Sequence, residues 1–207
     1  MKCPLSPVRL LFSAILLVCA PSITARTFFV DAANLGIEEG TQEHPFRNIE
    51  PAMERATEGD TIMIAAGRYA PNEQTLRIQP GVALIGKSAE STVIDAMIRD
   101  LDAGSGVAAS LMNLTFTEFE FSRGESNGPF TGVNTLSGCI CQSIRIRHGA
   151  TYDSLDHRSH SFSIEGNRVH GSIEIVMGSV YGGIATVRNN VCGGISVGHA
   201  GSPDTIG

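Results

Sequence analysis

The stretch NRVHGSIEI, residues 167–175, recurs as NNVCGGISV at residues 189–197, an offset of 22 positions. Both copies follow the pattern Asn-x-Val-x-Gly-x-Ile-x-(Ile/Val). Internal repeats with periods of about 20–50 residues are typical of solenoids and related architectures. At about 3.3 Å per extended residue, one period suffices for a circuit of three short strands and their bends. The repeat therefore predicts a parallel β-helix whose coils stack about 4.8 Å apart.

Stacking of similar coils predicts where individual side chains lie. Alternating apolar residues would fill the interior, with Ile173 and Ile195 on adjacent layers. Asparagines at corresponding bends, such as Asn167 and Asn189, would hydrogen-bond along the axis, and the 23 glycines suit tight bends. A leucine-rich repeat has a similar period but needs a leucine framework that is absent here. A sandwich of antiparallel hairpins stays open as the alternative fold.

Residues 27–95 predict short strands around a single helix. Over 48–58 the apolar residues recur at helical spacing, and Asn48 is a suitable N-cap. This helix precedes the first full coil, so its apolar face is the natural cover for the open end of the core. We expect a turn at 66–69 and, because 118–135 is polar and glycine-rich, a protruding loop there. The predicted strands are 28–30, 61–64, 76–78, 82–85, 92–95, 113–116 and 143–146.

The first 25 residues have the pattern of an export signal. Lys2 and Arg9 provide the positive start, and residues 10–20 form an apolar stretch too short for a transmembrane helix. Cleavage is expected before Arg26, which leaves 26–207 as one β-helix domain, secreted or periplasmic. A lipid anchor at Cys19 is disfavoured, because no small residue precedes that cysteine.

The charge of the chain excludes one class of partner. Removal of Lys2 and Arg9 from the 15 basic residues leaves 13 against 21 acidic ones, a net charge of about −8. Lys87 is then the single lysine. A nucleic-acid-binding protein needs a basic face, so we expect no nucleic-acid partner. No other apolar run is long enough to span a membrane.

Three cysteines remain once Cys3 and Cys19 leave with the signal. In an oxidising compartment Cys192 could pair with Cys139 or Cys141. The latter two are two residues apart and point the same way on one strand, which disfavours a bond between them. Buried apolar thiols are the other interpretation.

The C-terminal end shows no second capping helix, since residues 205–207 follow shortly after the last predicted coil. A stacked coil leaves apolar core and an unpaired strand edge at its end. We therefore expect either that the chain is a fragment of a longer β-helix or that a partner covers the lower edge.

Ordered motifs within 29–95 resemble one known module. They are FVD (29–31), GT (40–41), HPF (44–46), GDTI (59–62), AGRY (66–69), GVALIG (81–86) and TVID (92–95). As a set they resemble the N-terminal domain of unknown function that opens many pectin-lyase-like proteins. The resemblance implies an all-β fold, a right-handed parallel β-helix with one short N-terminal capping α-helix, and an extracytoplasmic setting. It also implies association with acidic or neutral polysaccharides, as for lyases, hydrolases and epimerases of this architecture. The shared motifs are turns, strands and a cap, so no catalytic residue carries over.

The densest polar cluster spans residues 152–160. A lyase that cleaves uronates would hold Ca²⁺ with carboxylates, for which Asp153 and Asp156 are candidates. It would also need a basic residue near the proton to be abstracted, and His157 and Arg158 are candidates. The competing interpretation is a solvated loop whose charges pair among themselves.

A second group of candidates lies on predicted strands. A glycoside hydrolase needs two carboxyl groups about 5–10 Å apart, and Glu118 and Glu120 would share one strand face, about 7 Å apart at the backbone. Arg145, Arg147 and His148 form a strip that could bind an acidic sugar through bidentate contacts. A solvated sheet face with acidic neighbours is the competing interpretation.

Two functional hypotheses follow. The first is an exported, polysaccharide-associated lyase or hydrolase, with Ca²⁺ as its cofactor if it is a lyase. The second is a non-catalytic surface or carbohydrate-binding scaffold, which the absence of Trp and the presence of only three Tyr favour. His157 and His160 lack a third ligand at a suitable spacing, so we expect no structural metal site.

Overall fold

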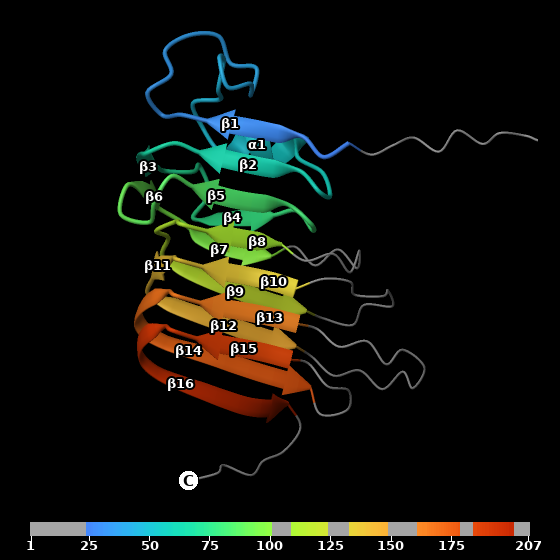
Figure 1. Ribbon diagram of the computed structural model, residues 1–207, viewed down its shortest axis with the longest axis vertical. Helices are drawn as coiled ribbons and strands as arrows, with labels where there is room; N and C mark the ends of the chain where they lie inside the picture. Colours follow the sequence, from blue (N-terminus) through green and yellow to red (C-terminus); the bar gives the residue numbers. More distant parts are fainter. Residues whose placement is uncertain (1–23, 101–108, 124–132, 149–160, 179–183, 201–207) are drawn as a thin grey trace, which may run out of the picture.

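Strands stacked as rungs along one axis make up the fold (Figure 1). The computed structural model describes residues 24–100, 109–123, 133–148, 161–178 and 184–200. Every strand pair within these ranges is parallel. The predicted all-β parallel β-helix is thereby confirmed, and the alternative of antiparallel hairpins is wrong.

Two sheets run along the solenoid. Sheet A follows the order β1-β2-β5-β8-β10-β13-β15, and sheet B follows β4-β7-β9-β12-β14-β16, with β11 beside β14. Strands β3 and β6 form a third, two-stranded sheet. The strands of sheet A are β1 Thr27–Val30, β2 Thr61–Ile64, β5 Ala83–Gly86, β8 Ser110–Met112, β10 Val133–Ser137, β13 Ser161–Glu165 and β15 Ile184–Arg188. The others are β3 Gly67–Tyr69, β4 Thr75–Ile78, β6 Thr92–Ile94, β7 Met97–Asp100, β9 Glu118–Arg123, β11 Ile140–Cys141, β12 Ser143–His148, β14 Arg168–Gly178 and β16 Val191–Ala200.

Inward side chains form continuous columns along the axis. In sheet B, the register partners Ile98, Phe119, Ile144 and Ile173 are all buried. Ile195 pairs with Ile173, which confirms the 22-residue repeat at this layer. Full burial of one such side chain stabilises the fold by about 1.5–3 kcal/mol, so these columns supply the main driving force for stacking.

The asparagine stack departs from the predicted register by one residue. Asn167 stacks on Asn190, whose Oδ1 accepts hydrogen bonds from both the backbone N–H and the Nδ2 of Asn167, each at 2.9 Å. The predicted partner, Asn189, instead adopts a positive φ of 55° at the bend. The pairing of β14 with β16 shifts between Val169 and Ser172. Strand β14 has one residue more than β16 at this irregularity. Register partners on the two strands are therefore 23 positions apart in the sequence before it and 22 positions apart after it.

The single described helix, α1, spans Glu50–Arg55 and is shorter than the predicted 48–58. Ile49 is its N-cap and makes no side-chain capping hydrogen bond, so the assignment of Asn48 as N-cap is wrong. The helix ends where Ala56 turns to an extended conformation, with φ −71° and ψ 139°. The helix therefore makes less than two turns, and its stability must come from packing on the coil below it.

Three further local predictions are wrong. The segment 66–69 is largely strand β3 rather than a turn, and it pairs with β6. The segment 113–116 contains only the isolated bridges of Thr115, whereas the strand β8 ends just before it. The expected loop 118–135 contains strand β9 and the start of β10; its alternating sequence EFEF buries Phe119 and Phe121 in the core. Residues 124–132 lie outside the described ranges.

The two ends of the described solenoid differ. At the N-terminal end, Ala52 and Met53 of α1 are buried in the core together with Phe46. At the other end, Ile195 and Val197 on β16 are 53% and 74% exposed. Side chains of the helix thus pack into the core near the first coil, while the last described rung presents apolar side chains to solvent. In the described ranges, no helix has both the length and the apolar character needed to cross a membrane.

Candidate functional site

Charged side chains line the outward face of sheet B. Arg99, Glu120, Arg145 and Glu174 are successive register partners on β7, β9, β12 and β14, so they form one column. Arg77 on β4 precedes Arg99 in the same column. Rungs of a sheet lie about 4.8 Å apart, which brings each charge within reach of the next. With two neighbours on β9 and β12, these residues make up what we call the charged ladder: Arg77, Arg99, Glu118, Glu120, Arg145, Arg147 and Glu174.

The local sequence explains this arrangement. Strand β9 begins EFEF and strand β12 contains IRIR, so each strand alternates charged and apolar residues. The apolar residues are drawn into the core, and the period of two then places every charged residue on the opposite face. Parallel stacking in register brings the glutamates of β9 beside the arginines of β12.

The ion pairs of the charged ladder fall into one short contact and three long ones. Arg99 Nη2 lies 2.6 Å from Glu120 Oε2. Arg145 Nη1 lies 3.6 Å from Glu118 Oε2, and Arg145 Nε lies 3.6 Å from Glu174 Oε2. Arg147 Nη2 lies 3.5 Å from Glu174 Oε1. The arginines are about half exposed, and exposed pairs of this kind are worth about 0–1 kcal/mol. A ligand can therefore replace the long pairs at little cost.

Two polar side-chain atoms of sheet B have no hydrogen-bond partner among the described residues. They are Arg99 Nε and Ser143 Oγ, both shielded from solvent. Ser143 is the register partner of Glu118. Hydrogen-bonding capacity therefore remains unused on this face of the sheet.

The structure brings together part of the predicted site. Arg145 and Arg147 lie on the outward face of β12, as predicted. Both have acidic neighbours, a feature that the competing interpretation of a solvated sheet face also predicts. Glu118 and Glu120, predicted to share a strand face, do so on β9. His148 is the last residue of β12, and its side chain is not among those described.

The predicted catalytic cluster lies outside the described residues. It comprises Asp153, Asp156, His157 and Arg158, all within 149–160. The two proposed Ca²⁺ ligands belong to this cluster. In the part of the chain that the structure does describe, no group of three or more His, Cys, Asp or Glu residues is placed to hold a metal ion.

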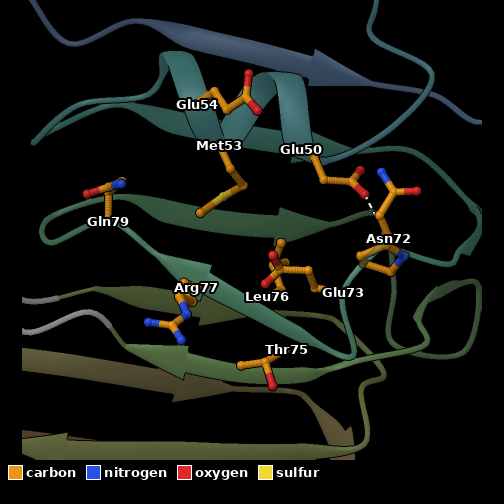
Figure 2. A pocket seen from close by; sticks show the side chains of 10 residues that line it. Glu50, Met53, Glu54, Asn72, Glu73, Thr75, Leu76, Arg77 and Gln79 are labelled. Atoms are coloured by element: carbon orange, nitrogen blue, oxygen red, sulfur yellow. Dashed lines mark hydrogen bonds between the residues drawn. The ribbon is translucent and has the colours of Figure 1, made fainter.

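A cavity of about 420 Å³ lies between α1 and strand β4 (Figure 2). Its lining comes from the helix, from residues 71–73 and from β4. No sequence motif indicates this cavity, because its lining residues come from separate segments of the chain. The cavity exists because a helix rather than a strand of sheet B follows β1 in the first coil.

The three cysteines within the described ranges, Cys139, Cys141 and Cys192, are free thiols. Cys141 and Cys192 lie on one inward column, but Val169 occupies the rung between them, which keeps their sulfur atoms too far apart to bond. Burial raises the pKa of Cys139 to about 11 and that of Cys141 to about 12. Both thiols therefore stay protonated at neutral pH, which suits a structural role.

Asp60 fastens the start of the solenoid. Its side chain is buried and accepts hydrogen bonds from the N–H of Arg26 at 2.7 Å and the N–H of Thr57 at 2.9 Å. Burial by itself would raise the pKa of this carboxyl, but these hydrogen bonds and the Arg26 guanidinium bring the pKa below 3.8. The ionised form is therefore the one that the fold stabilises.

Comparisons with known proteins assign no relative. No family model matches the chain, no curated protein is similar to it, and no solved structure matches it.

Proposed function

We propose that this chain is an exported β-helix protein of the pectin-lyase-like kind that binds a polysaccharide along the charged ladder of sheet B. The observation that carries the proposal is the charged ladder, which places four arginines and three glutamates on the outward face of sheet B of a chain that is acidic as a whole. Export rests on the N-terminal sequence pattern.

A sheet face of this kind suits a long, regular polymer. The rungs repeat about every 4.8 Å, so donors and acceptors recur along the axis as they do along a glycan chain. A guanidinium binds a uronate carboxylate through two parallel hydrogen bonds. Carboxylates such as Glu118 and Glu174 accept hydrogen bonds from sugar hydroxyls. The excess of arginine over glutamate favours an acidic glycan.

Hydrolysis by Glu118 and Glu120 is a second candidate function. Their backbones are about 7 Å apart on one strand face, and glycoside hydrolases hold their two carboxyl groups about 5–10 Å apart. The short contact of Glu120 with Arg99 favours binding over catalysis, because it engages one oxygen of that carboxylate in an ion pair. Lyase chemistry would instead depend on Asp153 and Asp156, with Ca²⁺ as its cofactor.

Binding is tested with the full chain against uronate-containing and neutral polysaccharides. Replacing both Arg145 and Arg147 with alanine should weaken binding of the acidic polymer at least about tenfold, because charge-assisted hydrogen bonds worth about 1.5–3 kcal/mol each are lost. The matched control is Arg188→Ala, an exposed arginine on sheet A. Equal affinity of the double variant, the control and the parent protein would contradict the proposal.

Catalysis is tested separately on the same polymers. Release of reducing ends or of unsaturated products, with and without Ca²⁺, distinguishes a hydrolase, a lyase and a binding protein. Loss of hydrolysis in Glu120→Gln would identify β9 as its source, while loss of lyase activity in Asp153→Ala or Asp156→Ala would identify 152–160. Binding without either product would identify a non-catalytic scaffold.

A further inference from the structure

In the order along the chain, helix α1 takes the place that a strand of sheet B takes in the next coil. The chain passes from β1 through α1 to β2 in the first coil, and from β2 through β4 to β5 in the second. Strand β4 is accordingly the end strand of sheet B. The 420 Å³ cavity lies between this edge and the helix (Figure 2). We call it the helix–edge groove.

The edge of β4 offers unused backbone groups to this groove. The N–H of Met97 donates to the carbonyl of Gln74 at 2.8 Å, which fixes the side of β4 that faces β7. In a parallel pair, the N–H and C=O groups of successive residues point alternately to the two sides. The N–H and C=O groups of Thr75 and Arg77 therefore point away from β7, toward α1, and none of them has a backbone partner within the described ranges.

A side chain already imitates a neighbouring strand at one point. The carboxylate oxygen Oε1 of Glu50 accepts a hydrogen bond from the N–H of Asn72 at 2.8 Å, just before β4 begins. Figure 2 shows this carboxylate reaching down from the helix to the chain that leads into β4. An acceptor at this place is what the carbonyl of an added strand would supply.

The groove has an apolar floor and a largely acidic rim. Met53 reaches from the helix toward β4, and both Met53 and Leu76 are nearly buried, so they form the floor. Three carboxylates stand on the rim against one guanidinium: Glu50, Glu54 and Glu73 against Arg77. The rim therefore favours a cationic partner.

We propose that the helix–edge groove binds an extended peptide with basic residues, which adds a strand to the free edge of β4. Addition of a strand takes its affinity from main-chain hydrogen bonds and its specificity from alternate side chains. Every second side chain of the peptide would contact the floor, and the basic ones would meet the acidic rim. The cavity is lined by Thr75, Leu76 and Arg77 of β4 and by Gln79 just after it, a stretch of about 16 Å, and a volume above about 300 Å³ is in the range of ligand sites.

The probe is the blocked pentapeptide acetyl-Arg-Val-Thr-Val-Arg-amide, titrated calorimetrically into the full chain. We expect binding, and we expect hydrogen exchange of the Thr75 and Arg77 amides to slow at least about tenfold when the peptide is saturating, since each then gains a partner. The triple variant Glu50→Gln, Glu54→Gln, Glu73→Gln should weaken binding at least about tenfold, because it keeps the shape of the rim and removes its charge.

Matched controls distinguish addition of a strand at the edge of β4 from nonspecific electrostatic attraction of a basic peptide to an acidic protein. The variant Glu43→Gln, Glu58→Gln, Glu90→Gln removes the same charge at exposed positions outside the groove, and it should bind the peptide like the parent protein. A peptide with methylated backbone nitrogens should not bind. Replacement of Arg145 and Arg147 should leave peptide binding unchanged, so a failure of the polysaccharide proposal is distinguishable from a failure of this one.

The following outcomes of the peptide experiments would overturn the proposal. They are absence of peptide binding, equal binding by the groove and control variants, binding of the methylated peptide, and binding without slower exchange of the two edge amides. Displacement of the bound peptide by a neutral oligosaccharide at similar concentration would instead identify the groove as a sugar site and would also overturn the peptide assignment.

Discussion

Substitution of Asn167 by alanine tests whether side-chain hydrogen bonds along the axis hold neighbouring coils together. Asn167 is buried, and its Oδ1 accepts a hydrogen bond from the N–H of Cys139 at 2.8 Å. Its Nδ2 donates to the carbonyl of Leu136 at 3.0 Å and to Oδ1 of Asn190 at 2.9 Å. One side chain thus joins three successive coils.

The expected cost follows from these three bonds. At a net value of about 1 kcal/mol each, Asn167→Ala should lower the free energy of unfolding by about 3 kcal/mol. For a protein of this size, about 2–4 °C in Tm corresponds to each kcal/mol, so Tm should fall by about 6–12 °C. Asn167→Asp should be at least as damaging at neutral pH, because an oxygen would then face the two acceptors that Nδ2 now contacts.

Thermal unfolding followed by circular dichroism measures this change. The control is Asn189→Gly, because Asn189 is exposed and its positive φ of 55° suits glycine, so Tm should stay the same or rise slightly. A loss of less than about 2 °C in Asn167→Ala would refute the reasoning, since it would mean that the buried amide adds almost nothing to stacking.

Three further predictions concern other parts of the fold. The pKa of Asp60 is lower in the folded protein than its ordinary value of 3.8. The ionised carboxylate therefore adds stability that is complete well above pH 3.8 and is lost as the pH falls through the folded pKa. The variant Asp60→Asn should abolish this part of the acid-induced fall in Tm. Iodoacetamide at pH 8 should modify Cys192 and, in the folded state, spare Cys139 and Cys141, as peptide mass spectrometry can check. Gly86→Ala should lower the stability to urea by about 1–3 kcal/mol, because the added methyl group would collide with the backbone of the next coil.

The parallel β-helix architecture could be predicted from the sequence because the 22-residue repeat indicates the length of one coil. Ile173 and Ile195 recur at the spacing of one coil, and the structure places them on adjacent rungs. The error at Asn189 shows the limit of this method. A shift of one residue near the glycine pair 193–194 leaves the repeat pattern intact but moves the stacking partner to Asn190.

The charged ladder was predictable only in part. Alternation in β12 indicated that Arg145 and Arg147 share an outward face. Their contacts with Glu118 and Glu174 depend on which strand stacks on which, and the coils from β7 to β14 differ in length, so no fixed offset connects these residues. The helix–edge groove gave no sequence signal, because an edge is defined by the strand that is missing beside it.

The difference between the two ends of the described solenoid has an energetic consequence. Each coil contacts only its neighbours, so stability is close to a sum of terms between adjacent layers, and a disturbance fades with distance along the axis. Among the described strands, β16 pairs with β14 alone and its Ile195 and Val197 are exposed, whereas strands nearer to α1, such as β2, pair on both sides. Within the described solenoid, opening should therefore start at β16 and advance coil by coil toward α1, and the amide protons of these strands should exchange with solvent in that order.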